Sequence, residues 1–303
     1  MAVALAGYAL SEQLLEAKNQ LRGVDWRFAA MVVVGLIIYQ LVNASVWTDV
    51  LRSIGCNVKR SDATKVWIES ESLKWLPGGL WGYGSRVVSS GSLGVQKRAA
   101  SLSLVWELML TNLAWGGLAL SVFFSAPIMQ AVADWAAVAL DYGAYFWMSL
   151  VLMCIVFLGG CYFVISRYKE KLTCLLDIRQ FDLKVSAGVF IKYFALCVYN
   201  TSLFYLACLA IPGGGVNWLS ALAIGSSAWI VGFWAIGVPG GIGVREAFIV
   251  LLMQLYIPVE SAIAVAVLWR ILQMVSEIAG VLLVVMSRQK QTIKPQEASH
   301  ERA

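Results

Sequence analysis

The strongest constraint on this chain is a set of apolar segments that are long enough to cross a lipid bilayer. A membrane-spanning helix needs roughly 20 consecutive, mostly apolar residues. Five runs reach that length, at residues 28–47, 101–124, 143–165, 188–211 and 261–286. The chain is 60% hydrophobic and only 14% charged, whereas an ordinary soluble domain is about 25% charged. The sequence therefore predicts an all-α polytopic membrane protein.

The distribution of lysine and arginine predicts the orientation of these spans, because positive charges near span ends stay on the cytoplasmic side. Basic residues gather at 52–65 and 97–98, at 167–184 and at 288–294, whereas none occurs from Ala99 to Ser166 or from Tyr193 to Val244. The rule places the C-terminus inside and the N-terminus outside. Residues 1–27, a predicted amphipathic segment, are an exception because they carry Lys18, Arg22 and Arg27 on the outer side.

Two shorter apolar pieces end in the same pattern. The first runs into Pro77-Gly78-Gly79 with Arg86 following, and the second into Pro239-Gly240-Gly241-Ile242-Gly243-Val244-Arg245-Glu246. Proline and repeated glycine cannot continue a helix, so the backbone must break at both places. In lipid such a break is tolerated only where it lines a protein cavity or a water-filled site. Because each copy follows one span and precedes another, the pattern indicates an internal repeat.

The loops around the two copies predict opposite orientations. Those flanking the first copy are basic and therefore cytoplasmic, and those flanking the second are not. We expect a helical bundle of two inverted repeats, each with a broken or re-entrant helix pair at its Pro-Gly-Gly motif. The predicted parts are repeat one (28–124), a linking span with a basic loop (125–187), repeat two (188–286) and a polar cytoplasmic tail (287–303). Residues 218–238 are also long enough to cross fully, which would place Arg245 near the cytoplasm.

The second break has the features of a site for an anionic group. Its glycines let a ligand approach, the helix N-terminus that follows favours an anion, and Arg245 adds a positive charge. Deep inside spans lie Glu107, 30 residues after Pro77, and Arg270, 31 residues after Pro239. The candidate substrate-binding residues are Arg86, Glu107, Arg245, Glu246, Arg270 and Glu277, together with Pro77, Gly78, Gly79, Pro239, Gly240, Gly241 and Gly243.

Two purely structural roles compete with this hypothesis. The second break could be a cytoplasmic loop between helices. The buried charges could be ion pairs that only hold the bundle together, Glu107 with Arg270 or Arg245 with Glu277.

Several kinds of chemistry have no support in the sequence. The only histidine is His300 in the polar tail, the cysteines form no C-x-x-C pair, and no G-x-x-x-x-G-K-[ST] motif occurs. We therefore expect no metal site, no cofactor and no ATP use. We also expect no nucleic-acid partner, and an enzyme here would depend on carboxylates, arginine or serine.

These motifs resemble those of the integral-membrane family of the lysylphosphatidylglycerol synthase transmembrane region, which includes many stand-alone lipid flippases. The matching residues are Lys74-Trp75-Leu76-Pro77-Gly78-Gly79, Gly84-Ser85-Arg86, Glu107, Pro239 to Glu246 and Leu268-Trp269-Arg270. Two features depart from the family. Its members commonly have a further N-terminal span, and no soluble aminoacyl-transferase domain follows Met286, so lipid lysylation is not expected.

The resemblance implies that the chain moves an anionic phospholipid or a polyprenyl-phosphate-linked sugar between the leaflets of a bacterial or archaeal plasma membrane. Arg86 and Arg245 would contact phosphate, and Glu107 and Glu277 would balance charge. One alternative is a membrane-embedded lipid-phosphate transferase with Glu107 or Glu246 as base. Another is a non-catalytic scaffold that binds the enzymes of envelope-glycan assembly.

Overall fold

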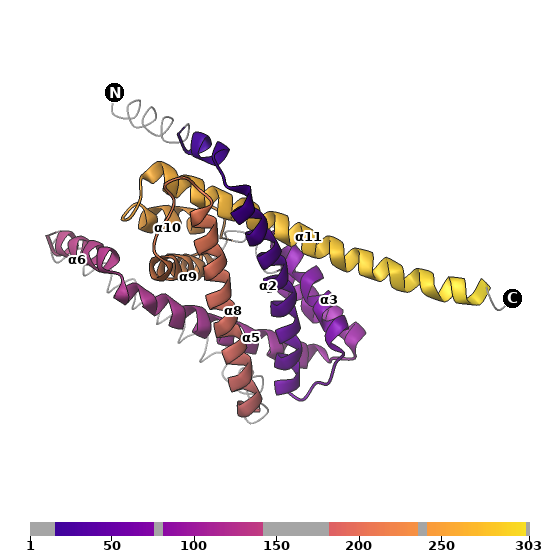
Figure 1. The fold of residues 1–303 in the computed structure, drawn as a ribbon. Helices are drawn as coiled ribbons and strands as arrows, with labels where there is room; N and C mark the ends of the chain where they lie inside the picture. Colours follow the sequence, from indigo (N-terminus) through magenta and orange to yellow (C-terminus); the bar gives the residue numbers. More distant parts are fainter. Residues whose placement is uncertain (1–15, 76–80, 142–181, 236–240, 301–303) are drawn as a thin grey trace.

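Four long helices form the frame of the molecule (Figure 1). The computed structural model describes residues 16–75, 81–141, 182–235 and 241–300, and every element in these ranges is helical. The long helices are α2 (Trp26–Ser53), α5 (Lys97–Ala119) with the short 3-10 helix η3 (Leu120–Phe124), α8 (Leu183–Leu209) and α11 (Val259–His300). Each contains a segment long and apolar enough to cross a membrane.

These four segments confirm four of the five predicted spans. They are Trp26–Ser53, Lys97–Phe124, Lys184–Leu209 and Val259–Ser287. The fifth predicted span, 143–165, lies outside the described residues, as does most of the predicted basic loop. Helix α11 does not end at the predicted end of its span but continues to His300, well beyond the bundle (Figure 1).

Shorter helices lie between the long ones. In the first half these are α3 (Arg60–Glu71), η1 (Ser72–Trp75), α4 (Trp81–Ser89) and η2 (Ser90–Leu93); in the second they are α9 (Trp218–Trp234) and α10 (Val244–Met253). Among the α-helices, the order long, short, short, long therefore occurs twice, and in the first half the 3-10 helices η1 and η2 follow the two short ones. The predicted breaks lie between η1 and α4 and between α9 and α10. Pro77, Gly78, Gly79, Pro239 and Gly240 themselves lie outside the described residues.

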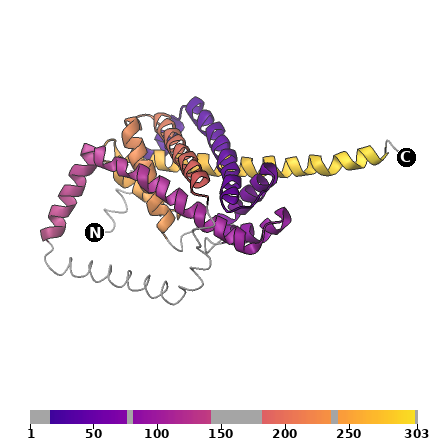
Figure 2. The same cartoon turned by 90° about the horizontal axis from the view of Figure 1, so that it is seen from below.

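Contacts between the two halves follow a matching pattern. Helix α2 packs against α8, so the first helices of the two halves are neighbours. Helix α5 packs against α8 and α9, and α11 packs in the corresponding way against α2 and α3. Helix α6 (Ala126–Asp141) follows the first half and projects away from the other helices (Figure 2).

Helices α2 and α8 run antiparallel, and their ends are joined by matching hydrogen bonds. Asp25 caps the start of α2, and its N–H donates to the carbonyl of Ala210 at the end of α8 at 2.9 Å. Asp182 caps the start of α8, and its N–H donates to the carbonyl of Ser53 at the end of α2, also at 2.9 Å. Each first helix therefore begins where the other ends.

Glycines allow α2 to approach its neighbours closely. A side chain at Gly35 would come within 2.5 Å of Leu203 in α8, and the Tyr199 hydroxyl donates to the Gly35 carbonyl at 3.2 Å. Further along α2, Gln40 lies directly over Gly280 of α11. Small residues at such crossings are typical of helices that associate in lipid, where close van der Waals contact drives packing.

Candidate functional site

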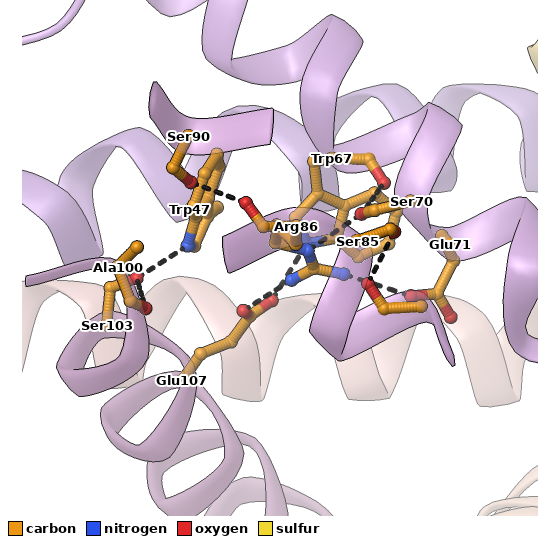
Figure 3. A network of polar contacts seen from close by, with 11 residues as sticks. Trp47, Trp67, Ser70, Glu71, Ser85, Arg86, Ser90, Ala100, Ser103 and Glu107 are labelled. Atoms are coloured by element: carbon orange, nitrogen blue, oxygen red, sulfur yellow. Dashed lines mark hydrogen bonds and ion pairs between the residues drawn. The ribbon is translucent and has the colours of Figure 1, made fainter. Parts of the chain in front are cut away.

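A buried ionic cluster joins α3, α4 and α5 in the first half (Figure 3). The guanidinium of Arg86 donates from Nη1 to Glu107 at 2.7 Å, from Nη2 to Glu71 at 3.1 Å and from Nε to Ser70 at 2.8 Å. All three of its nitrogens therefore have partners within the protein. The Arg86 side chain is only 2% exposed.

Tryptophans surround this cluster on several sides. Trp67 donates its indole N–H to Glu107 at 2.9 Å, so this carboxylate is bonded on both oxygens. The rings of Trp67 and Trp47 lie 4.9 and 5.6 Å from the Arg86 guanidinium carbon, which adds a cation–π attraction at a desolvated site. The cluster is therefore a filled, mutually satisfied network that fixes α4 to α3 and α5.

In the second half an ion pair also joins the last two helices, but here the long helix carries the arginine and the short helix carries the glutamate. Arg270 Nε of α11 lies 3.3 Å from Glu246 Oε1 of α10, and both side chains are partly exposed. The other Glu246 oxygen accepts the Gly243 N–H at 2.5 Å, so Glu246 also caps the start of α10. The break in the sequence predicts Arg245 and Glu246 in the opening turn of this helix, and α10 does begin at Val244.

The backbone entering α10 requires glycine. Gly241 and Gly243 have φ of +69° and +81°, a left-handed region that favours glycine. A side chain at Gly241 would come within 2.8 Å of the Gly232 carbonyl oxygen, and one at Gly232 would come within 2.8 Å of Arg245 Nε. The second break is therefore folded tightly onto α9, with the Arg245 side chain lying across Gly232.

A small internal cavity lies beside Arg245, with room for about one water molecule. Its polar lining consists of Arg245, Asn200, Thr201 and Gln273, and its apolar walls of Phe204, Gly225, Ala228, Trp229, Ile249 and Trp269. Arg245 Nε and Gln273 Oε1 are buried and have no hydrogen-bond partner among the described residues. Since buried polar atoms are nearly always paired, these two atoms indicate a place for a polar ligand or a water.

Residues at matching positions of α2 and α8 have different surroundings in the two halves. Trp47 and Phe204 are each the twenty-second residue of their helix, α2 and α8. Trp47 covers the Arg86 cluster, whereas Phe204 lines the cavity. The cavity wall is also tied to the first half, because Trp229 stacks on Trp115 of α5 with ring centroids 4.8 Å apart.

The predicted charged residues fall into two groups. Arg86 and Glu107 meet in the first half, and Glu246 and Arg270 meet in the second. The predicted pairing of Glu107 with Arg270 is wrong, because each charge has a partner within its own half. Arg245 lies within electrostatic reach of Glu277.

One residue of α2 interacts electrostatically with charges of both halves. Tyr39 is close enough to Glu71 of the first half, and to Arg245 of the second, to interact electrostatically with both. The two halves thus bring their polar groups toward α2, although the cavity beside Arg245 is lined by α8, α9, α10 and α11 alone.

Some site residues were not predicted from the sequence. Trp67, Ser70 and Glu71 complete the shell of Arg86, and their spacing on α3 would have shown a shared polar face. Asn200 and Thr201 line the cavity, and they are adjacent polar residues within an otherwise apolar span. This polar pair inside an apolar span is the feature of the sequence that indicates the cavity.

Among the described residues, no group of three histidine, cysteine, aspartate or glutamate side chains could hold a metal ion.

A comparison with protein families found a match that covers most of the chain. The family model of the lysylphosphatidylglycerol synthase TM region matches residues 1–280. The comparison with curated proteins gave no match.

Proposed function

Because the chain belongs to the family of the lysylphosphatidylglycerol synthase TM region, we propose that it moves an anionic or polyprenyl-phosphate-linked lipid between membrane leaflets. The family and the four apolar long helices make it a multi-pass membrane protein of the lipid-modification or flippase type. The finer assignment, to translocation of a phosphate-bearing lipid, rests on the cavity in the second half.

The observation that carries this proposal is the buried Arg245 Nε, which has no hydrogen-bond partner among the described residues and lies beside a cavity with polar and aromatic walls. An arginine presents a fork of N–H donors that matches phosphate oxygens. Asn200 and Gln273 add amide groups that can bond to a headgroup. A ligand phosphate that accepts from Arg245 would therefore satisfy the buried donor. The cavity is small, so the headgroup enters when α10 moves relative to α9.

The arrangement of the halves supports transport by alternating access. The repeated element order, the matching contacts between halves and the antiparallel α2 and α8 are the features expected of an inverted repeat. In this proposal the breaks lie near the middle of the membrane. The filled cluster around Arg86 keeps the first half rigid while the second half opens and closes.

The transferase alternative gains less support from the same geometry. Its two candidate bases are Glu107 and Glu246, and both already form ion pairs. Glu107 accepts from Arg86 and Trp67, and Glu246 accepts from the Gly243 N–H. A base must have a lone pair directed at the proton that it removes. Neither carboxylate is placed to act on a lipid in the cavity.

The proposal is tested with proteoliposomes that contain a trace of fluorescent phosphatidylglycerol, fluorescent polyprenyl phosphate or fluorescent phosphatidylcholine. Dithionite added outside bleaches only the label in the outer leaflet unless the protein moves the lipid. We expect wild-type protein to move at least one of the two anionic probes faster than the neutral one. Arg245→Ala should slow that movement at least tenfold, because a charge-assisted contact to phosphate is lost.

Matched variants make the result specific. Arg27→Ala removes an exposed arginine at the start of α2 and should transport normally, and Arg245→Lys should retain part of the activity because it keeps the charge but not the fork. Normal transport by a well-folded Arg245→Ala protein would remove this residue from the mechanism. Equal movement of all three probes would contradict the substrate class.

A further inference from the structure

A further charged site lies at the C-terminal end of α2, outside the cavity and the Arg86 cluster. Asp49 is buried and pairs with three cations, each from a different position in the fold. Its Oδ1 atom is 3.2 Å from Arg52 and 2.7 Å from Arg60, and its Oδ2 atom is 2.7 Å from Lys192. The cations come from α2, from the first residue of α3 and from α8.

These three cations carry more charge than Asp49 can neutralise. One carboxylate faces three cations, which leaves a surplus of two positive charges. The Asp49 side chain is 9% exposed, whereas those of Arg52, Arg60 and Lys192 are 46%, 49% and 52% exposed. Arginine has five N–H donors and lysine has three, so each retains donors that point to its surroundings. The buried carboxylate holds the three cations in place, and their exposed sides form one basic surface.

The position of the surface fits the edge of a membrane. Asp49 is four residues before the end of α2, about 6 Å along the helix axis. Lys192 lies within the membrane-spanning part of α8, and its flexible stem carries the ammonium back to Asp49, as lysines do near an interface. The distribution of positive charge places this end of α2 on the cytoplasmic side.

We propose that Arg52, Arg60 and Lys192 form a binding site for the phosphate of an anionic phospholipid in the cytoplasmic leaflet. Anionic lipids attract basic residues near the membrane surface, and arginine pairs with phosphate through two parallel hydrogen bonds. A lipid is the source that fits, because the surface lies at the end of a membrane span and not in an aqueous groove. This site is separate from the Arg245 cavity, so it stands whether or not the chain moves lipid.

The test measures lipid retained by the purified full-length protein. Protein is equilibrated in mixed micelles with phosphatidylglycerol or phosphatidylcholine, and bound lipid is counted by native mass spectrometry. We expect wild type to retain phosphatidylglycerol in preference to phosphatidylcholine. Arg60→Gln and Lys192→Gln should each weaken that retention about fivefold, and together more strongly. Lys97→Gln, which removes an exposed lysine at the start of α5, should leave it unchanged.

Two further measurements separate a specific loss of lipid binding from misfolding, and a lipid site from a site for free phosphate. The comparison is repeated in the Arg245→Ala background, where lipid held in the Arg245 cavity no longer contributes to the count. We expect the same loss of retention for Arg60→Gln there, and size-exclusion chromatography detects any misfolded variant. If Lys192→Gln does not fold, Arg60→Gln alone decides, because this half-exposed residue lies at the start of α3. Equal retention of phosphatidylglycerol by wild type and by folded Arg60→Gln protein would overturn the proposal. So would release of the lipid by millimolar inorganic phosphate, which would show a site for the free ion.

Discussion

Glu107 of α5 and Arg270 of α11 carry opposite charges at corresponding places, and each pairs with the short helix before it. Glu107 bonds to Arg86 of α4 at 2.7 Å, and Arg270 lies 3.3 Å from Glu246 of α10. In both halves an ion pair therefore joins the last long helix to the short helix before it. The long helix supplies the acid in the first half and the base in the second. The two pairs differ in environment, because the first is nearly fully buried and the second is partly exposed.

This difference predicts unequal costs for neutralising the two glutamates. Glu107→Gln leaves the buried Arg86 with less compensation, and we expect the free energy of unfolding to fall by about 3 kcal/mol. Glu246→Gln should cost about 1 kcal/mol or less, because its pair is more exposed to screening and the amide oxygen still accepts the Gly243 N–H. Thermal unfolding in detergent measures both.

Asp134→Asn is the control for that comparison, since Asp134 is an exposed acid on α6. It should leave the unfolding midpoint unchanged. Equal losses for Glu107→Gln and Glu246→Gln would contradict the difference in burial on which the prediction rests.

Trp67→Phe should destabilise the first half through a lost hydrogen bond and a smaller buried ring. A phenyl ring can still face the Arg86 guanidinium, but the indole N–H that bonds to Glu107 at 2.9 Å is removed, and the missing part of the indole leaves a gap in a buried site. We expect a loss of about 1–2 kcal/mol in unfolding free energy, since a bond to a charged acceptor is stronger than a neutral one. Trp135→Phe on α6, where the side chain is exposed, should be silent. A silent Trp67→Phe would mean that Glu107 needs only Arg86.

The two left-handed glycines of the second break should respond differently to alanine. Gly243→Ala meets no atom within 4 Å, so only the backbone conformation, with φ of +81° and ψ of −45°, is strained, at a cost of about 1–3 kcal/mol. Gly241→Ala is also strained, at φ of +69°, and in addition places a methyl group 2.8 Å from the Gly232 carbonyl oxygen. Backbone atoms cannot move aside as a flexible side chain can. We expect Gly241→Ala to lower the unfolding midpoint clearly more than Gly243→Ala, and the reverse order would contradict the tight fold of the break.

The sequence was sufficient to predict the elements that depend on local patterns. Apolar length predicted the four long helices. The second Pro-Gly-Gly motif predicted the backbone that is not α-helical at Ala235 and Gly241 between α9 and α10, because proline and glycine act on the backbone where they stand. Pro77, Gly78 and Gly79 of the first motif lie outside the described residues. The start of α10 before Arg245 followed from the same reasoning. The end of α11 did not, since polar residues after Met286 do not by themselves stop a helix.

The partners of the buried charges could not be read from the sequence in the same way. Glu107 could have paired with any arginine that packing brought near it, and only the fold shows that Arg86 is the one. The sequence does not single out Asp49, because its three cations come from positions up to 143 residues away. The cavity was also hidden, since the residues that line it come from four different helices. Such properties arise from packing between helices.

Membrane topology gives a direct test of the inverted halves. If the halves are inverted, the start of α3 and the loop before α9 face opposite sides. Ser61 is exposed at the first of these places, and Gly215 is exposed at the second. A side chain at Gly215 would come no closer than 3.8 Å to Leu209, whereas one at Gly214 would come within 2.7 Å of the Cys208 carbonyl oxygen. Gly215→Cys is therefore the better probe.

Each cysteine is introduced singly into a chain whose six native cysteines are replaced by serine, and that chain without added cysteine is the control. A membrane-impermeant maleimide is applied to right-side-out vesicles and then to permeabilised ones. We expect Gly215→Cys to react in intact vesicles and Ser61→Cys only after permeabilisation, because basic residues around Ser61 place it inside. Reaction of both from the same side would exclude the inverted arrangement and, with it, alternating access between the two halves.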